Sequence, residues 1–258
     1  MASLVRIGTF LLGLLSSVSC FSQAIDVAVA SNFMAAAKAL QADFEQRGVH
    51  RINLVAGSTG KHYAQIINGA PFDIFLAADR RRPQLLEQQG RAVQGSRFSY
   101  AIGQLVLWSA AENSVDDKGR VLDVGEFKRL AIANPKLAPY GRAAQQVLEN
   151  KAALQGEYSS RLLRGENINQ AFQFVHSGNA ELGFVALSQL KTLAKNANGE
   201  IPGSHWVVPN DLYDPIEQQA VQLSDDPAAS AFLRYLKSPA GQSVIAKFGY
   251  LLPVAGDT

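Results

Sequence analysis

The sequence predicts an α/β protein of two lobes, each built on a mostly parallel sheet that helices flank. Short apolar segments alternate with amphipathic ones from Ile25 onward, and strands that alternate with helices pair in parallel through right-handed crossovers. The rhythm changes after Ser99, where a second group of strands and helices begins. A chain of 258 residues, 47% of them hydrophobic, can bury two cores of roughly 100 to 150 residues each. We expect residues 25–103 plus 212–258 to form lobe 1 and residues 104–211 to form lobe 2.

Strands and helices alternate in the first part of the chain. Apolar residues three or four positions apart predict one face of a helix, as at Phe33, Ala37 and Leu40. Gly69 and Pro71 separate a helix from the strand that follows it. The pattern predicts strands over 25–30, 51–56 and 73–77, and helices over 33–47, 59–68 and 82–89.

The second part of the chain has longer polar stretches, such as 111–125, between its apolar segments. Its pattern predicts strands over 104–108, 130–133, 182–186 and 206–208, and helices over 141–149 and 169–176. Two amphipathic helices, over 228–236 and 240–248, are expected at the end of the chain. Because the predicted lobe 1 includes this tail, the chain must cross between the lobes twice.

The first 24 residues have the order of a secretory signal peptide. Arg6 precedes a short apolar run, and small residues at Ser22 and Ala24 follow where a peptidase can cut. The run is shorter than the roughly 20 residues that a membrane span needs. We expect residues 1–24 to be removed on export.

Cys20 is the only cysteine of the chain. A cysteine just after an apolar run can also be the lipid-modified residue of a lipoprotein, but residues 17–19 match the usual leucine–small–small pattern poorly. We interpret Cys20 as part of the signal peptide, so the mature chain would have no disulfide.

The charges of the chain are nearly balanced. Lysine and arginine together number 24, aspartate and glutamate 22, and neither sign forms a long block. A nucleic acid or an anionic membrane surface attracts proteins with a clustered positive charge. We therefore expect no nucleic-acid partner.

Polar or backbone-exposing residues recur where a predicted strand ends and a helix begins. Ser31 and Asn32 open one helix, and the segments 57–60, 139–141 and 167–169 open three others. The unpaired amides and the positive dipole at a helix start favour an anion, and loops after parallel strands lie at one edge of a sheet. Serine and asparagine are also common helix caps, so any one of them alone indicates a cap. Four such starts, split between two lobes, indicate an anion site.

Other kinds of site have weaker support. The four histidines have no zinc-ligand spacing. Ser58 and His62 stand four positions apart, but no Gly-x-Ser-x-Gly turn and no third orienting group accompany them. The sequence has no phosphate loop and no dinucleotide fingerprint. A secreted α/β enzyme therefore stays as an alternative without a recognisable catalytic pair.

Seven short segments stand in a characteristic order along the mature chain. They are AVASNF at 28–33, AGSTG at 56–60, GAPFDIFLAAD at 69–79, APYG at 138–141, GENI at 165–168, GNAELGFV at 178–185 and FGYLLP at 248–253. Through them, and over nearly the whole mature chain, the sequence resembles the periplasmic molybdate-binding proteins of ATP-driven molybdate transporters. No single segment is decisive, but their order and spacing are hard to obtain by chance.

The resemblance implies a type II periplasmic binding protein fold with the ligand cleft between the lobes. It implies a periplasmic monomer, not an enzyme, that needs no cofactor. Such a protein captures molybdate, and also tungstate, and delivers the anion to the permease of an ABC importer. Carried over by position, Ser31 and Ser58 supply hydroxyl and amide donors, Asn32 a second polar contact, and Tyr140 and Ile168 backbone N–H groups. Molybdenum then has no direct protein ligand.

One position departs from part of the family. Some members have a ligand tyrosine after the Gly-Phe-Val segment, where this chain has Ala186. Without that tyrosine, the site either uses Asn32 and Tyr140 as donors in its place or has one donor fewer. Neutral donors suffice for a tetrahedral dianion, because each such hydrogen bond is charge-assisted. Another oxyanion, sulfate or phosphate, stays as an alternative ligand, as does ferric ion, for which Tyr213 and Tyr250 are available but not clustered.

Overall fold

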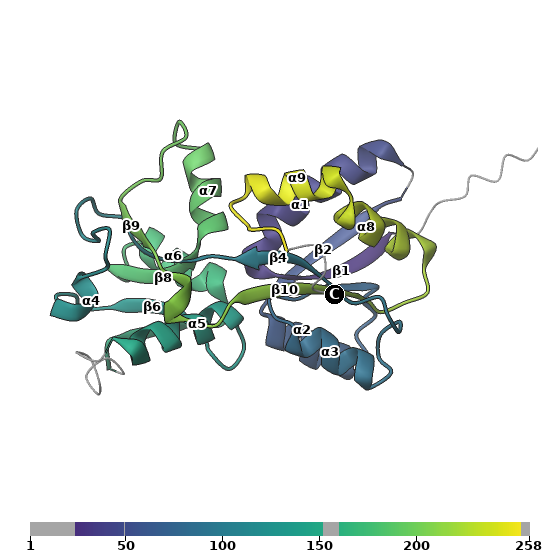
Figure 1. Ribbon diagram of the computed structural model, residues 1–258, viewed down its shortest axis with the longest axis horizontal. Coiled ribbons are helices and arrows are strands. Elements are labelled where there is room, and N and C mark those ends of the chain that lie inside the picture. Colours follow the sequence, from purple (N-terminus) through teal and green to yellow (C-terminus); the bar gives the residue numbers. More distant parts are fainter. Residues whose placement is uncertain (1–23, 49, 152–159, 254–258) are drawn as a thin grey trace, which may run out of the picture.

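The computed structural model describes residues 24–48, 50–151 and 160–253. Cys20 and almost all of the predicted signal peptide lie outside these ranges. Figure 1 shows two lobes side by side, each with one five-stranded sheet between layers of helices. No helix of the described ranges is long and apolar enough to cross a membrane.

The sheet of the first lobe has the strand order β2-β1-β3-β10-β4. Its strands are β1 (Ile25–Ala30), β2 (Ile52–Gly57), β3 (Ile74–Leu76), β4 (Phe98–Gly103) and β10 (Ile216–Gln222). β1 pairs in parallel with β2 and β3, whereas β10 lies antiparallel to both β3 and β4. Every strand except β10 therefore runs in one direction, as the prediction of a mostly parallel sheet requires.

The sheet of the second lobe repeats this arrangement in the order β7-β6-β8-β5-β9. Its strands are β5 (Leu105–Ser109), β6 (Leu130–Ala133), β7 (Leu162–Gly165), β8 (Leu182–Ala186) and β9 (Ser204–Val207). β6 is parallel to β7 and β8, and β5 is antiparallel to β8 and β9. Here β5 is the one strand that runs against the other four. The predicted two-lobed α/β class with mostly parallel sheets is confirmed.

The chain crosses between the sheets twice. It leaves the first sheet at Gly103 and enters the second at Leu105, and it returns between Val207 and Ile216. The predicted lobe limits at 103/104 and 211/212 fall within these two connections. They remain our proposal for the division of the chain.

Helices cover both faces of each sheet. In the first lobe these are α1 (Met34–Arg47), α2 (Thr59–Ile67), α3 (Arg81–Gln88), α8 (Pro227–Lys237) and α9 (Pro239–Lys247). In the second lobe they are α4 (Val121–Val124), α5 (Pro139–Asn150), α6 (Ile168–His176) and α7 (Leu187–Lys195). Short 3-10 turns, η1 (Ser31–Phe33) and η4 (Asn210–Leu212), precede α1 and β10. Figure 1 shows α1, α8 and α9 on one face of the first sheet and α2 and α3 on the other.

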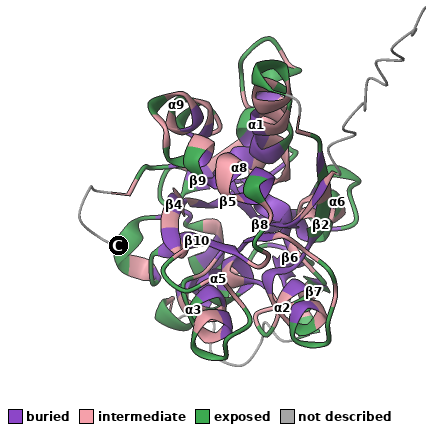
Figure 2. Ribbon diagram, turned by 90° about the vertical axis from the view of Figure 1, so that its right-hand side faces the viewer, coloured by how far each residue is buried: buried purple, intermediate pink, exposed green. Residues whose placement is uncertain are grey.

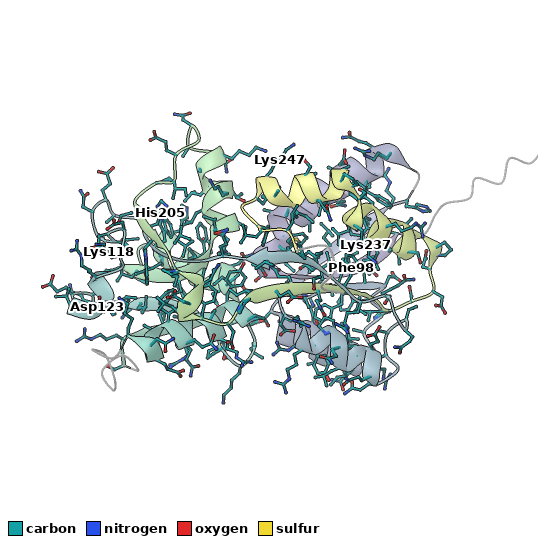
Figure 3. All side chains as sticks on the ribbon, in the orientation of Figure 1. Phe98, Lys118, Asp123, His205, Lys237 and Lys247 are labelled. Carbon is teal, nitrogen blue, oxygen red and sulfur yellow. The ribbon has the colours of Figure 1, made fainter. Side chains whose placement is uncertain are left out.

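Each lobe has its own large apolar core. Phe33, Leu40 and Phe232 are fully buried in the first lobe, and Trp108 and Phe184 are buried in the second. Figure 2 shows the strands largely buried and the exposed residues on the outer sides of the helices. At the edge of the first sheet the Nζ of Lys237 lies 4.1 Å from the centroid of the Phe98 ring, which joins α8 to β4 (Figure 3). The two cores let the lobes act as separate rigid supports for a site between them.

Among the described strands and α-helices, five were missed by the sequence pattern: β4, β7, β10, α4 and α7. β4 and β10 contain polar residues that a buried strand usually lacks, and these residues pair with each other across the sheet. The Nε2 of Gln219 donates to Ser99 Oγ at 3.0 Å, and Ser99 Oγ also donates to Glu217. α7 begins directly after β8, with no glycine or proline between them to mark the boundary.

Candidate functional site

Two helix starts of the first lobe lie side by side. Ala30 at the end of β1 pairs in parallel with Gly57 at the end of β2. Ser31 and Ser58 follow these two residues, so both emerge at the same edge of the sheet. Ser31 begins η1, and Ser58 is the N-cap of α2, where its Oγ accepts a long hydrogen bond of 3.4 Å from the Lys61 N–H.

The second lobe presents two helix starts in the same way. Ala133 at the end of β6 pairs with Gly165 at the end of β7. A Cβ atom on Gly141 would overlap the carbonyl oxygen of Ala133, so glycine lets the first turn of α5 rest on the end of β6. At the start of α6 the Asn167 side chain caps the helix by accepting from the Gln170 N–H at 3.1 Å.

The four helix starts meet where the lobes touch. The Gly60 N–H in the first turn of α2 donates to the Leu137 carbonyl, just before α5, at 2.8 Å. The Lys61 Nζ lies 3.0 Å from the Glu166 Oε1, just before α6. η1 contacts both α6 and α7. The structure therefore brings all five predicted site residues to one region between the lobes.

This region is buried and contains the first turns of several helices. The exposed fraction is 6% or less for each of the five residues: Ser31, Asn32, Ser58, Tyr140 and Ile168. Ser58 lies outside the named helices and strands, and among the backbone hydrogen bonds of the described turns and loops none comes from its N–H. Amides in the first turn of a helix have no partner within that helix, and the helix dipole adds positive potential there. The arrangement can hold an anion without any charged side chain.

The side chain and the carbonyl of Asn32 are hydrogen-bonded inside the protein. Its Nδ2 donates to the Gln218 Oε1 at 2.8 Å and to the Tyr250 Oη at 3.1 Å. Its carbonyl oxygen accepts from the Tyr250 Oη at 2.7 Å and from the Ser188 Oγ at 3.0 Å. Both side-chain amide hydrogens of Asn32 are thus used inside the protein.

Ala186 is fully buried and precedes α7. Its N–H donates to the Gln189 Oε1 at 3.0 Å, and the Gln189 Nε2 donates to the Asn169 Oδ1 at 2.7 Å. The start of α7 is therefore tied to the start of α6 by Gln189. The methyl side chain of Ala186 supplies no hydrogen-bond donor at this position.

Two cavities lie at the junction of the lobes. One, of about 440 Å³, runs between α1 and the helices α6 and α7 and reaches Ser31 and Asn32. The other, of about 360 Å³, lies between the start of α3 and α5 and is lined by several basic side chains. Among them, Arg82 crosses between the lobes, since its Nη2 donates to the Lys136 carbonyl at 3.1 Å. Solvent thus reaches the junction from two sides of the buried region.

Three buried tyrosines and one buried histidine near the site are held neutral. Burial raises the pKa of the Tyr100, Tyr140 and Tyr250 hydroxyls, so these remain protonated. Burial also lowers the pKa of His62, whose Nε2 lies 3.2 Å from the Val29 carbonyl and whose Nδ1 lies 3.1 Å from the Gln65 Oε1. Both ring nitrogens of His62 therefore face groups other than Ser58.

Sequence reasoning missed the residues that support the site from behind. Gln218 is fully buried on β10, and Ser188 and Tyr250 join its network. Tyr250 was considered only as a possible ferric ligand. No local pattern marks these residues, because each contacts positions that are distant in the sequence.

Comparison with known proteins places the chain among binding proteins. Residues 25–251 match the family described as bacterial extracellular solute-binding protein. The chain is 51% identical over 238 residues to the molybdate-binding protein ModA of Azotobacter vinelandii, covering 90% of this chain and 92% of the relative. It is 43% identical over 252 residues to ModA of Rhodobacter capsulatus, covering 96% of each. The solved periplasmic molybdate-binding protein of Azotobacter vinelandii superposes with a TM-score of 0.83 at 40% identity, covering 89% of this chain and 99% of that one.

Proposed function

Because the chain belongs to the family of bacterial extracellular solute-binding proteins, we propose that it captures molybdate between its lobes and delivers it to the permease of an ABC importer. The observation that carries this proposal is the convergence of four helix starts, with their first-turn N–H groups and two serine hydroxyls, on one buried region. The two relatives described above are molybdate-binding proteins. In this proposal Ser31, Asn32, Ser58, Tyr140 and Ile168 hold the oxygens of the anion, and molybdate is a ligand rather than a cofactor.

The chemistry of the donors suits an anion that carries no proton. Hydroxyl and N–H groups all donate to oxyanion oxygens, and none of the five proposed residues has a carboxylate that could accept a proton from the ligand. Phosphate keeps at least one proton at neutral pH, and a buried polar group left unmatched costs about 1 to 3 kcal/mol. Tungstate has nearly the size and the charge of molybdate, so the same donors should bind both.

A thermal-shift screen tests the proposed ligand. Molybdate and tungstate should raise the melting temperature of the protein much more than equal concentrations of sulfate or phosphate, because a ligand that binds only the folded state stabilises it. Ferric ion belongs in the same panel. A larger shift with sulfate, phosphate or ferric ion than with molybdate would contradict the proposed ligand.

We also propose export as a monomer after removal of residues 1–24. The support is the order of Arg6, the apolar run and the small residues Ser22 and Ala24. Mass spectrometry of the protein recovered from the periplasm should find a chain that begins near Ile25. A chain that keeps an acylated Cys20 would instead indicate a lipoprotein.

A further inference from the structure

A buried glutamine lies behind the anion-binding region, on a strand that follows one of the two crossings between the lobes. Gln218 of β10 is 0% exposed. Its Oε1 accepts from the Asn32 Nδ2 at 2.8 Å and from the Tyr100 Oη at 3.2 Å. The carbonyl end of Gln218 therefore holds the turn that presents Ser31 and Asn32 in the first lobe.

The other end of the same amide faces the second lobe. Gln218 Nε2 and Tyr140 Oη are the two buried side-chain polar atoms of the described ranges that lack a hydrogen-bond partner. Both lie against Gly103, where a Cβ atom would overlap the Tyr140 hydroxyl and would lie 3.0 Å from the Gln218 Nε2. A donor from one lobe and an acceptor from the other thus face the same small space. Glycine at 103 keeps that space open.

Buried polar groups are nearly always hydrogen-bonded in folded proteins, and a buried group without a partner is costly. Both atoms border the same point beside Gly103, so they are neighbours across the lobe junction. We propose that Gln218 is a positioning residue that joins the two halves of the anion site. Its Oε1 holds Asn32, and its Nε2 donates to the Tyr140 hydroxyl when the lobes close on the anion.

This inference rests on the proposed function, because Asn32 and Tyr140 are the groups through which Gln218 acts. Gln218 itself does not touch the anion. Its hydrogen bond to Asn32 and the proposed one to Tyr140 set where the η1 turn and the start of α5 lie relative to each other, and both segments belong to the proposed site. Replacement of Gln218 should therefore weaken anion binding even though no group that contacts the anion is removed.

The neighbouring residue provides a matched control. Gln219 is also buried on β10, but its Oε1 accepts from the Arg97 Nη1 at 2.8 Å and its Nε2 donates to the Ser99 Oγ at 3.0 Å, away from the site. Gln218→Met and Gln219→Met both remove a buried amide and keep a side chain of similar length. A purely structural role would make the two variants alike in molybdate affinity.

The test is calorimetric titration of the parent and of both variants with molybdate, with the melting temperature of each ligand-free protein measured alongside. Gln218→Met should bind molybdate about tenfold more weakly, the size expected for one lost hydrogen bond. Gln219→Met should stay within about twofold of the parent. Equal affinities in the two variants would overturn the inference. If the parent protein and Gln218→Met bind molybdate equally tightly, the inference about Gln218 is wrong but the proposed function stands. If the parent protein binds no oxyanion, both the inference and the proposed function are wrong.

A double-mutant cycle shows whether Gln218 acts through Asn32. Residues that act through one another give non-additive losses, so adding Gln218→Met to Asn32→Ala should weaken binding by less than about threefold further. Fully additive losses would contradict the assigned role. If Gln218→Met does not fold, Tyr140→Phe tests the other end, since it removes only the hydroxyl. It should weaken molybdate binding several-fold, and unchanged or tighter binding would overturn the joining of the lobes.

Discussion

The two lobes build the site from the same structural feature but with different donors. In each lobe, paired parallel strands end side by side and helices begin just beyond them. The first lobe places serine side chains, Ser31 and Ser58, at its helix starts. The second lobe places Tyr140 and Ile168 there, whose side chains pack in the core of that lobe. In the proposed site, side-chain substitutions can therefore remove donors from the first lobe, whereas the donors of the second lobe are lost only when the backbone moves.

The largest expected effect comes from moving the backbone of the second lobe. In Gly141→Ala the new Cβ meets the carbonyl oxygen of Ala133, a backbone atom that cannot rotate away, so the start of α5 must shift. Molybdate binding should weaken by about 3 kcal/mol, more than a hundredfold, because a charge-assisted bond at Tyr140 is lost and its neighbours are strained. Calorimetric titration measures the loss. Gly48→Ala is the control, since nothing lies within 4 Å of a Cβ at that position, and parental affinity in Gly141→Ala would contradict this view of the second lobe.

The next largest effect belongs to the serines of the first lobe. Ser31→Ala and Ser58→Ala should each weaken molybdate binding by about 1.5 to 3 kcal/mol, the size of a hydrogen bond to a charged group. Ser58 is also a helix cap, so the melting temperature of each ligand-free variant must be measured with its affinity. If both variants bind molybdate as tightly as the parent, the assigned donors of the first lobe are wrong.

A smaller effect is expected at the bridge between the lobes. Lys61 and Glu166 are each about half exposed, and exposed ion pairs contribute less than about 1 kcal/mol. Lys61→Met should therefore weaken molybdate binding only slightly, and the difference from the parent should shrink as salt is added. Surface plasmon resonance or calorimetric titration at low and at high salt would measure this difference in molybdate affinity. A loss as large as that of Ser58→Ala would mean that Lys61 interacts with the anion itself.

The smallest effect on affinity should come from the side chain of Ile168. Ile168→Ala keeps the backbone N–H at the start of α6 and removes apolar atoms that are 2% exposed. Stability should fall by about 2 to 5 kcal/mol, measured by urea unfolding, while molybdate affinity changes less than about threefold. If Ile168→Ala lost as much molybdate affinity as Ser58→Ala, the proposed difference between side-chain donors in the first lobe and backbone donors in the second would be wrong.

The parts of the site that the sequence predicts are those made locally. Ser31 and Ser58 stand directly after apolar strands, so the strand pattern and the capping residues together indicate where the helices start. The lobes, the order of most elements and the four helix starts follow from the same local signals. β10 could not be predicted in this way, because Glu217, Gln218 and Gln219 are polar residues in succession. Their segment is buried by pairing with neighbouring strands, which the local sequence does not show.

The support behind the site depends on contacts between distant positions. Tyr250 bonds to Asn32, 218 positions away, and to Ser188, 62 positions away. Neither hydrophobic periodicity nor a short motif carries information about such pairs. The role of Gly103 could not be predicted from the sequence either, because it depends on the space that this glycine leaves for the Tyr140 hydroxyl across the lobe junction.

The central claim is that a buried site lined by donors selects an unprotonated tetrahedral dianion of the size of molybdate. Sulfate also carries no proton, so only its smaller size can exclude it: in a cage built for the larger anion its hydrogen bonds would be stretched beyond their usual length. Competition calorimetry with sulfate against the molybdate-loaded protein tests this most directly. We predict that a large excess of sulfate leaves molybdate bound, while tungstate displaces it at comparable concentration. Displacement of molybdate by an equal concentration of sulfate would contradict the claim.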